Sequence, residues 1–377
     1  MVFTKISMLS EIISGQSPQS CFYNLEKIGL PFYQGKKEFS EKYIDTPSVW
    51  TTQKTKVARK GDILMSVRAP VGPVNFATEK CCIGRGLAII RPNEKIDKEY
   101  LFYFFINYQK YISGHGGAVF DSINKDEIGN IEIPLPPMEE QKKIAARLDA
   151  VSDLLAKQKQ LLSEQDNLIQ STFYDMFGTP EINEKGFPAH KISEICELNP
   201  KKPKEIDDNT ECSFVPMSAV SEDGELNLTQ IKLYEDVKKG FTYFAEEDVL
   251  FAKITPCMEN GKGTIAKGLK NKLGFGSTEF HVLRPLNDIS NARWLFQITK
   301  FKKFRENAEK SMTGSAGQKR VPAGFFDNYF IPVPPFELQQ KFAAVVEQIE
   351  SEKSKIKSAI AETQTLFNSM MSEYFEE

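Results

Sequence analysis

One long segment occurs twice in this chain of 377 residues. The sequence IPLPP at residues 133–137 returns as IPVPP at residues 331–335, and EEQKKIAARLDAV at 139–151 aligns with ELQQKFAAVVEQI at 337–349. A repeat of this period is far longer than the repeating unit of a solenoid protein. The duplication therefore predicts the order globular domain, long helix, globular domain, long helix.

The repeat predicts four parts with defined boundaries. We expect globular domains at residues 1–136 and 179–334, each followed by a helical segment, at 137–178 and 335–377. Short runs of β-forming residues between turn residues, with one helix each at 98–111 and 292–307, predict α+β domains. The expected fold class is thus two pseudo-repeated α+β domains separated by two long antiparallel coiled-coil helices.

The first helical segment has clear start and stop signals. Residues 138–177 contain neither proline nor glycine, Pro137 suits the first helical position, and Gly178 with Pro180 forms a stop signal. Apolar residues in both segments alternate by four and three positions, which is typical of a coiled-coil seam, although one side of an ordinary helical bundle is the alternative. We expect the helices to pair through Ile144, Leu148, Val151, Leu155, Leu162, Ile169, Phe342, Val346, Ile349, Ile356, Ile360 and Phe367.

Basic residues near glycines are the candidate ligand-binding positions. Residues 261–272 hold four lysines and three glycines, which suits an exposed loop that contacts phosphates, with a solvated hairpin tip as the alternative. A glycine-rich segment follows each short helix, and the second ends in Lys319 and Arg320, whereas the first contains His115 and ends in AVFD. We therefore expect two different DNA-reading surfaces, built from Arg68, Arg85, His115, Lys253, Lys262, Lys267, Lys270, Lys319 and Arg320.

Composition adds weaker constraints. The net charge of −3 gives little evidence for or against a nucleic-acid partner. No apolar run approaches the roughly 18 residues that a membrane span needs, so we expect no membrane and a cytoplasmic location. The six cysteines form no C-x-x-C pair, and with only three histidines the sequence predicts no metal site.

Catalytic motifs are missing from the sequence. It contains neither the G-x-x-x-x-G-K-[ST] phosphate loop nor a G-x-G-x-x-G segment after a strand. The VPPF run at residues 333–336 has the prolines and the aromatic residue of an adenine methyltransferase motif but lacks its polar residue. We therefore expect a non-catalytic chain.

The chain resembles the specificity subunit of type I restriction–modification systems. The resemblance is carried by the I-P-x-P-P-x-E-x-Q helix start at residues 133–145 and 331–343, and by KIS at 5–7 and 191–193. The run GSTEFHVLRP at residues 276–285 adds to it, whereas the first domain departs from the pattern with GRGLA in the corresponding place. Together these segments extend the resemblance over essentially the whole chain.

The resemblance implies a non-catalytic reader of double-stranded DNA. Each globular domain would bind one half of a bipartite target, and the helices would set the spacing of the halves and dock two methyltransferase subunits. Those subunits would use S-adenosylmethionine to methylate adenine at N6, and two restriction subunits that use ATP and Mg²⁺ could join them, so no cofactor is expected in this chain. The alternative from another class is a non-catalytic two-domain scaffold that binds other proteins.

Overall fold

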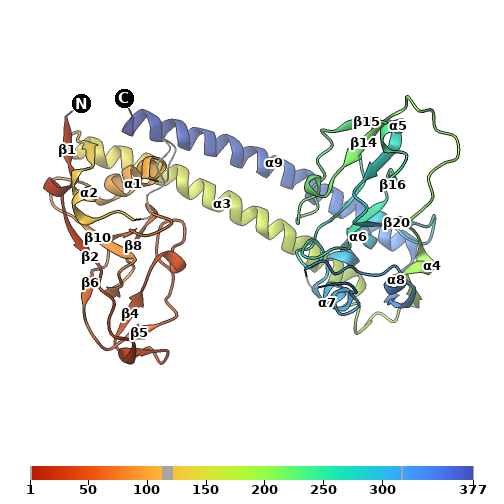
Figure 1. Ribbon diagram of the computed structural model, residues 1–377, viewed down its shortest axis with the longest axis horizontal. Helices are drawn as coiled ribbons and strands as arrows, with labels where there is room; N and C mark the ends of the chain where they lie inside the picture. The colour runs from red at the N-terminus through yellow and green to blue at the C-terminus, as the bar shows by residue number, and fades with distance from the viewer. Residues whose placement is uncertain (1, 113–121, 316, 377) are drawn as a thin grey trace. The chain divides into compact units, whose positions relative to one another are not determined.

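The computed structural model describes residues 2–112, 122–315 and 317–376. These residues form two compact units: unit 1 comprises Met1–Leu161 and Ile356–Glu377, and unit 2 comprises Leu162–Lys355. Both long helices, α3 (Met138–Phe177) and α9 (Phe336–Phe375), are continuous and contribute to both units (Figure 1). Each unit thus combines one globular part with parts of both helices, and the four-part division of the chain stays a prediction.

Unit 1 contains two main sheets. The first has the strand order β2-β10-β7-β8, the second has the order β3-β5-β4-β9-β6, and β1 pairs separately with β11. The strands are β1 (Phe3–Lys5), β2 (Ser10–Ser14), β3 (Tyr23–Asn24), β4 (Leu30–Tyr33), β5 (Trp50–Thr51), β6 (Lys56–Ala58), β7 (Ile63–Ser66), β8 (Val74–Phe76), β9 (Cys81–Ile83), β10 (Leu87–Pro92) and β11 (Glu132–Pro134). The helices of this globular part are α1 (Lys98–Ile112) and α2 (Lys125–Asn130), with 3₁₀ turns at Ile6–Met8, Ser20–Phe22 and Lys36–Glu38.

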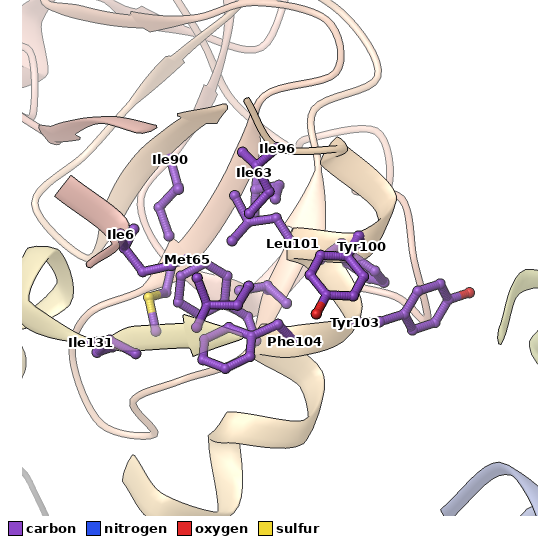
Figure 2. Close-up of a cluster of buried hydrophobic side chains, with 14 of the residues drawn as sticks. Ile6, Ile63, Met65, Ile90, Ile96, Tyr100, Leu101, Tyr103, Phe104 and Ile131 are labelled. Carbon is purple, nitrogen blue, oxygen red and sulfur yellow. The ribbon is translucent and has the colours of Figure 1, made fainter. Parts of the chain in front are cut away.

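The core of unit 1 forms where α1 covers the first sheet (Figure 2). Ile63 and Met65 lie two positions apart on β7, so their side chains point to the same face of the sheet. Leu101 and Phe104 of α1 belong to the same buried cluster. The aromatic run of α1 is therefore core, because its burial removes a large apolar area from water.

Unit 2 repeats this plan. Its sheets have the orders β13-β20-β17-β18 and β15-β14-β19-β16, and β12 pairs with β21. The strands are β12 (Ala189–Lys191), β13 (Cys196–Leu198), β14 (Glu211–Val215), β15 (Ile231–Leu233), β16 (Thr242–Ala245), β17 (Val249–Ala252), β18 (Gly263–Ile265), β19 (Leu273–Gly276), β20 (Phe280–Pro285) and β21 (Phe330–Pro332). The helices are α4 (Ile192–Ile195), α5 (Tyr234–Val237), α6 (Ala292–Lys300), α7 (Lys302–Lys310) and α8 (Gly324–Asn328), with 3₁₀ turns at Met217–Ala219 and Lys270–Lys272.

A buried ion pair marks the equivalence of the two units. In the β2-β10-β7-β8 sheet, Nη2 of Arg91 lies 2.7 Å from Oδ2 of Asp62, and in the β13-β20-β17-β18 sheet Nη2 of Arg284 lies 2.7 Å from Oδ2 of Asp248. Both arginines also donate Nε–H to the same carboxylate. The hydrogen bonds that Arg284 donates to the Asp248 carboxylate raise the pKa of Arg284. The ion pair explains why these acidic and basic positions recur in both copies.

One helix of the sequence prediction is wrong. The helix expected at residues 292–307 is broken at Phe301, whose backbone is extended (φ −63°, ψ 137°) between α6 and α7. The Phe301 ring packs against two aromatic rings of α3, with centroids 4.7 Å from Phe173 and 5.3 Å from Tyr174. This tertiary packing overrides the local helix preference, because the extended residue buries its ring against α3.

The long helices run antiparallel within unit 2. Phe173 and Phe177 near the end of α3 contact Phe342 near the start of α9, and Lys353 pairs with the more N-terminal Asp166. In unit 1, Arg147 near the start of α3 donates a 3.2 Å hydrogen bond to Tyr374 near the end of α9.

The residues expected to pair the helices fall into two groups by burial. Seven are buried: Ile144, Leu148, Leu155, Ile169, Phe342, Val346 and Ile349. Val151, Leu162, Ile356, Ile360 and Phe367 are half-buried. Near their ends the helices also pack into the globular cores, since Leu148 belongs to the core of unit 1 and Phe342 to that of unit 2. The individual pairing contacts stay predictions.

Among the described residues, no helix combines the length and the apolar character that crossing a membrane requires.

Candidate nucleic-acid interface

Three chain segments meet at the same place in the two units. The segments are the residues just after β7 or β17, those just before β10 or β20, and those that precede α2 or α8. We call the meeting places junction 1 (residues 67–68, 85–86 and 122–123) and junction 2 (residues 253–254, 278–279 and 319–321). They are equivalent positions of the duplicated scaffold, because the aligned strands enter and leave them in the same order.

The backbone hydrogen bonds of the two junctions correspond. In junction 1, the Val67 N–H donates to the Gly86 carbonyl (3.0 Å) and the Val67 carbonyl accepts from the Ile123 N–H (3.1 Å). In junction 2, the Lys253 N–H donates to the Glu279 carbonyl (2.9 Å), and the Lys253 carbonyl accepts from Val321 N–H (2.9 Å). The frame is shared, so the two junctions differ through their side chains.

Junction 2 brings together three of the predicted DNA-contacting residues: Lys253, Lys319 and Arg320. The Arg320 guanidinium binds the Glu279 carboxylate through two hydrogen bonds, Nε to Oε2 at 2.9 Å and Nη2 to Oε1 at 2.8 Å. These hydrogen bonds lower the pKa of Glu279 and raise the pKa of Arg320. Lys319 is exposed, and its carbonyl accepts from the Thr255 N–H at 3.0 Å. The junction therefore combines a fixed arginine with two lysines.

Junction 1 brings together the other two predicted arginines. Arg68 and Arg85 are both exposed, on residues next to the Val67–Gly86 hydrogen bond. The backbone of Arg68 forms an isolated bridge with Ser122, so the chain after the glycine-rich segment contacts the end of β7. At the two positions that carry the ion pair in junction 2, junction 1 has Gly86 and Ser122, which are uncharged.

His115, with the glycine-rich segment at residues 113–121, lies outside the described residues. Its predicted DNA contact stays a prediction.

The expected lysine-rich loop at residues 261–272 is wrong as a single loop. Gly263–Ile265 forms β18, which pairs with β17, and Lys270–Lys272 forms a 3₁₀ turn. The three predicted lysines consequently lie beside three different neighbours. Lys262 Nζ is 3.4 Å from the Met217 carbonyl, Lys267 pairs with Glu347 at 3.0 Å, and Lys270 pairs with Glu211 at 3.0 Å. The last two ion pairs are exposed and stabilise the fold by only about 0–1 kcal/mol.

A buried histidine behind junction 2 escaped the sequence prediction. His281 is 5% exposed; its Nε2 lies 2.8 Å from the Val321 carbonyl and its Nδ1 lies 3.2 Å from Nδ2 of Asn199. Nε2–H therefore donates to Val321, and Nδ1 accepts from the Asn199 amide. Burial lowers the pKa of His281, so the ring supports the junction backbone in its neutral form. Its place in the GSTEFHVLRP run was the only available signal.

A buried arginine holds the loop that follows β17. Arg305 on α7 is 6% exposed, and its guanidinium donates to the carbonyls of Met258 (2.6 Å), Gly261 (3.1 Å) and Thr299 (2.7 Å). The Phe251 ring lies 4.9 Å from the same guanidinium, and burial lowers the pKa of Arg305 to about 10. These bonds satisfy backbone acceptors inside unit 2, so this arginine is structural, and the sequence KKFRENAEK did not distinguish it from a solvated residue.

Within the described ranges, no group of three or more His, Cys, Asp or Glu side chains is arranged to hold a metal ion.

Comparison with known proteins identifies the family. The family model described as "Type I restriction modification DNA specificity domain" matches residues 1–164 and 184–363, which is well over half of the chain. The chain belongs to this family. The resemblance inferred from the repeated helix motif is thereby confirmed.

The relatives of this specificity-domain protein align over part of their length. The "Type I restriction enzyme EcoAI specificity subunit" of Escherichia coli is 41% identical over 214 residues, which is 54% of this chain and 36% of the relative. The "Putative type I restriction enzyme MjaX specificity subunit" of Methanocaldococcus jannaschii is 52% identical over 150 residues, which is 38% of this chain and 34% of the relative. The chain thus aligns with about a third of the length of these curated relatives.

A solved structure shows the same fold. The chain is similar to the "Type-I restriction-modification system S subunit from M. genitalium", with a TM-score of 0.59 and 14% identity. The match covers 100% of this chain and 96% of the other. Together with the two matched specificity domains, it confirms the predicted fold class of duplicated α+β domains.

Proposed function

We propose that this chain is the DNA-recognition subunit of a type I restriction–modification complex, in which each unit reads one half of a bipartite target. The observation that carries the proposal is the pair of junctions. A shared backbone frame displays Arg68 and Arg85 in unit 1 and Lys253, Lys319 and Arg320 in unit 2. Divergent basic side chains on one frame are what two different half-site specificities require. The names of the relatives as specificity subunits support this role.

The chemistry of the junctions suits double-stranded DNA. Exposed lysines such as Lys319 neutralise phosphates and release counterions, which gives affinity without sequence preference. Arginines with a fixed guanidinium discriminate base edges in the major groove. Junction 2 therefore offers candidates for both kinds of contact within a few residues, and junction 1 offers two exposed arginines.

The long helices are proposed to set the half-site spacing and to dock two methyltransferase subunits. In unit 1, Leu154 and Leu161 lie one heptad apart on α3 and are 47% and 43% exposed. Residues spaced by seven lie on one face of a helix, so these leucines give α3 an apolar strip that a partner protein can cover. In the proposed assembly, S-adenosylmethionine, ATP and Mg²⁺ serve the methyltransferase and restriction subunits, and this chain does no chemistry itself. The cytoplasm is the compartment we expect for such a complex.

Salt-dependent DNA binding tests the proposal against the scaffold alternative. The chain would be purified in complex with a type I methyltransferase subunit, and the affinity for duplex DNA would be measured over a range of salt concentrations. A DNA reader loses affinity steeply as the salt concentration rises, because log K falls against log[salt] with a slope of about −0.9 per phosphate contact. Co-purification without DNA binding at low salt would refute the reader and favour the scaffold.

A matched pair of variants locates the binding surface. Lys253→Ala in junction 2 should reduce the magnitude of the salt slope by about one, because one phosphate contact is lost. Lys302→Ala removes an equally charged side chain that is 91% exposed on α7, outside the junction, and should leave the slope unchanged. Equal effects of the two substitutions would contradict the assignment of junction 2 to DNA.

A further inference from the structure

We infer that Arg320 reads a guanine in the half-site recognised by unit 2, and that Glu279 is the positioning residue that aims its guanidinium. The inference rests on the proposed function and deepens it, because it assigns a base and a geometry to one junction. It follows from counting the hydrogen bonds of one side chain, from the way that side chain is held, and from the charge of its neighbour.

The donor count leaves one edge of the guanidinium available. Arg320 has five N–H donors. Nε–H and one hydrogen of Nη2 bind the Glu279 carboxylate, at 2.9 and 2.8 Å, and one hydrogen of Nη1 binds the Gln318 carbonyl at 2.9 Å. Within the described part of the chain, the other two hydrogens, one on each Nη, have no acceptor. We take the Gln318 carbonyl, two residues back along the chain, to accept the Nη1 hydrogen that faces the side-chain stem. The two remaining hydrogens then share the outer edge of the planar group and point the same way.

That edge matches guanine. Two parallel N–H groups fit the O6 and N7 acceptors that guanine presents in the major groove, and this pairing is the commonest specific arginine contact to DNA. The Arg320 side chain is 41% exposed, so its outer edge is accessible although its inner edge is bonded.

Arg320 is held at both its backbone and its head group. Its N–H donates to the Thr313 carbonyl (2.9 Å) and its own carbonyl accepts from the Thr313 N–H (3.0 Å), while a further bridge joins it to Ile254. Glu279 is itself fixed, since its carbonyl accepts from Lys253 and its N–H donates to Ser277 Oγ at 3.2 Å. A side chain ordered in advance loses little conformational entropy on binding, which favours a directional contact.

Charge separates a base contact from a phosphate contact. The Glu279 carboxylate offsets the charge of Arg320, so the ion pair attracts a phosphate only weakly. The carboxylate oxygens of Glu279 would also lie close to a phosphate bound by Arg320 and would repel it. Hydrogen-bond direction at the outer edge is unaffected by this compensation. Lys319 is exposed beside the pair and suits the phosphate contact better. The geometry therefore points to base reading by the arginine and backbone contact by the lysine.

Junction 1 cannot use the same device. Ser122 occupies the position of Arg320, and Gly86 occupies the position of Glu279. A Cβ on Gly86 would lie 2.5 Å from the carbonyl oxygen of Gln34, so no larger residue fits there without a backbone shift. The inferred guanine contact consequently belongs to only one of the two half-sites.

Base preference in the intact complex tests the inference. The chain would be co-expressed with its methyltransferase, and the methylated motif determined by single-molecule sequencing for the wild type, Arg320→Lys and Glu279→Gln. We expect a guanine in one half of the wild-type motif. Arg320→Lys keeps the charge but removes the two parallel N–H groups, so discrimination between guanine and the other bases at that one position should fall by about 5- to 150-fold. Glu279→Gln should reduce the base discrimination at the same position by a smaller factor. The other half of the motif should be unchanged in both variants.

A charge-swapped double variant, Glu279→Arg with Arg320→Glu, separates reading from a merely structural ion pair. A structural pair would survive the swap with the motif intact, which would overturn the inference, whereas a reader changes its base at that position. An unchanged motif in Arg320→Lys, or equal loss at every position of both halves, would also overturn it. A wild type with no bipartite motif would refute the proposed function itself. A bipartite motif that is indifferent to Arg320 would refute only the present inference. Lys302→Ala is the control and should keep the wild-type motif.

Discussion

Gln339 closes the second copy of the repeated motif, and the structure gives this glutamine a physical role. Its side chain is completely buried. Oε1 accepts from the Asn291 N–H at 2.9 Å, and Nε2 donates to the carbonyls of Ile289 at 3.0 Å and Pro334 at 2.9 Å. Because Asn291 is the N-cap of α6, the glutamine joins the start of α9 to the start of α6. Gln339→Met keeps the length of the side chain and removes all three hydrogen bonds.

The expected cost follows from those three bonds. Each contributes about 0.5–1.5 kcal/mol net, so their loss destabilises unit 2 by about 1.5–4.5 kcal/mol. The substitution also leaves the three backbone partners without their hydrogen bonds to this side chain, so we expect a cost in the middle of this range or above. For a unit the size of residues 162–355, 1 kcal/mol shifts the melting temperature by about 2–4 °C. A loss of about 3 kcal/mol therefore predicts a decrease of roughly 6–12 °C.

Differential scanning calorimetry measures this change, and the neighbouring residue provides the control. Gln340 follows directly in the chain but is exposed, so Gln340→Met should leave the melting temperature nearly unchanged. The first motif offers an independent repeat of the experiment in unit 1. There Gln141 accepts from the Asp97 N–H at 2.8 Å and donates to the Pro136 carbonyl at 2.9 Å. Equal melting temperatures for the Gln339 and Gln340 variants would refute the role given to the motif glutamine.

Three further predictions concern stability and spacing. Asp248→Asn removes the charge that holds Arg284, and breaking a buried ion pair typically costs about 3–5 kcal/mol. Because the arginine side chain is 29% exposed, the free energy of unfolding measured with denaturant should fall by an amount near the lower end of this range. Burial lowers the pKa of His281, so below pH about 6.5 the unfolded chain binds a proton that the folded unit does not. Stability should therefore fall as the pH drops from 7 toward the folded pKa. His281→Gln should flatten this dependence of the urea midpoint, whereas substitution of His190, whose side chain is 45% exposed, should not. Deleting one heptad from each long helix should change the gap between half-sites but neither half-sequence; an unchanged gap would refute the spacing role.

Features fixed by local sequence could be predicted. The α3 boundaries follow from Pro137 and from the glycine and proline after Phe177, which act within a few residues of the helix ends. The duplication was visible because the repeated motif has structural roles that both copies need. The glutamine of the motif was visible too, but its three backbone partners were not, because they lie on a different element.

Features fixed by tertiary contacts could not be predicted. The break at Phe301 depends on rings of α3 that lie more than a hundred residues earlier in the chain. β18 has only three residues and forms by pairing with β17, so the segment looked like a lysine-rich loop. Junction 2 joins residues from positions 253, 279 and 320, and only the folded sheet brings them together. The sequence therefore identified Arg320 as a candidate but missed the Glu279 carboxylate that orients it.

Whether both units read DNA is tested most directly by single-molecule sequencing of DNA from cells that express this chain together with a type I methyltransferase subunit. We expect a new N6-methyladenine mark at a two-part motif with a fixed gap, which requires both units to read DNA. No new mark, although the two proteins co-purify, would contradict the claim, as would a mark at a single uninterrupted motif.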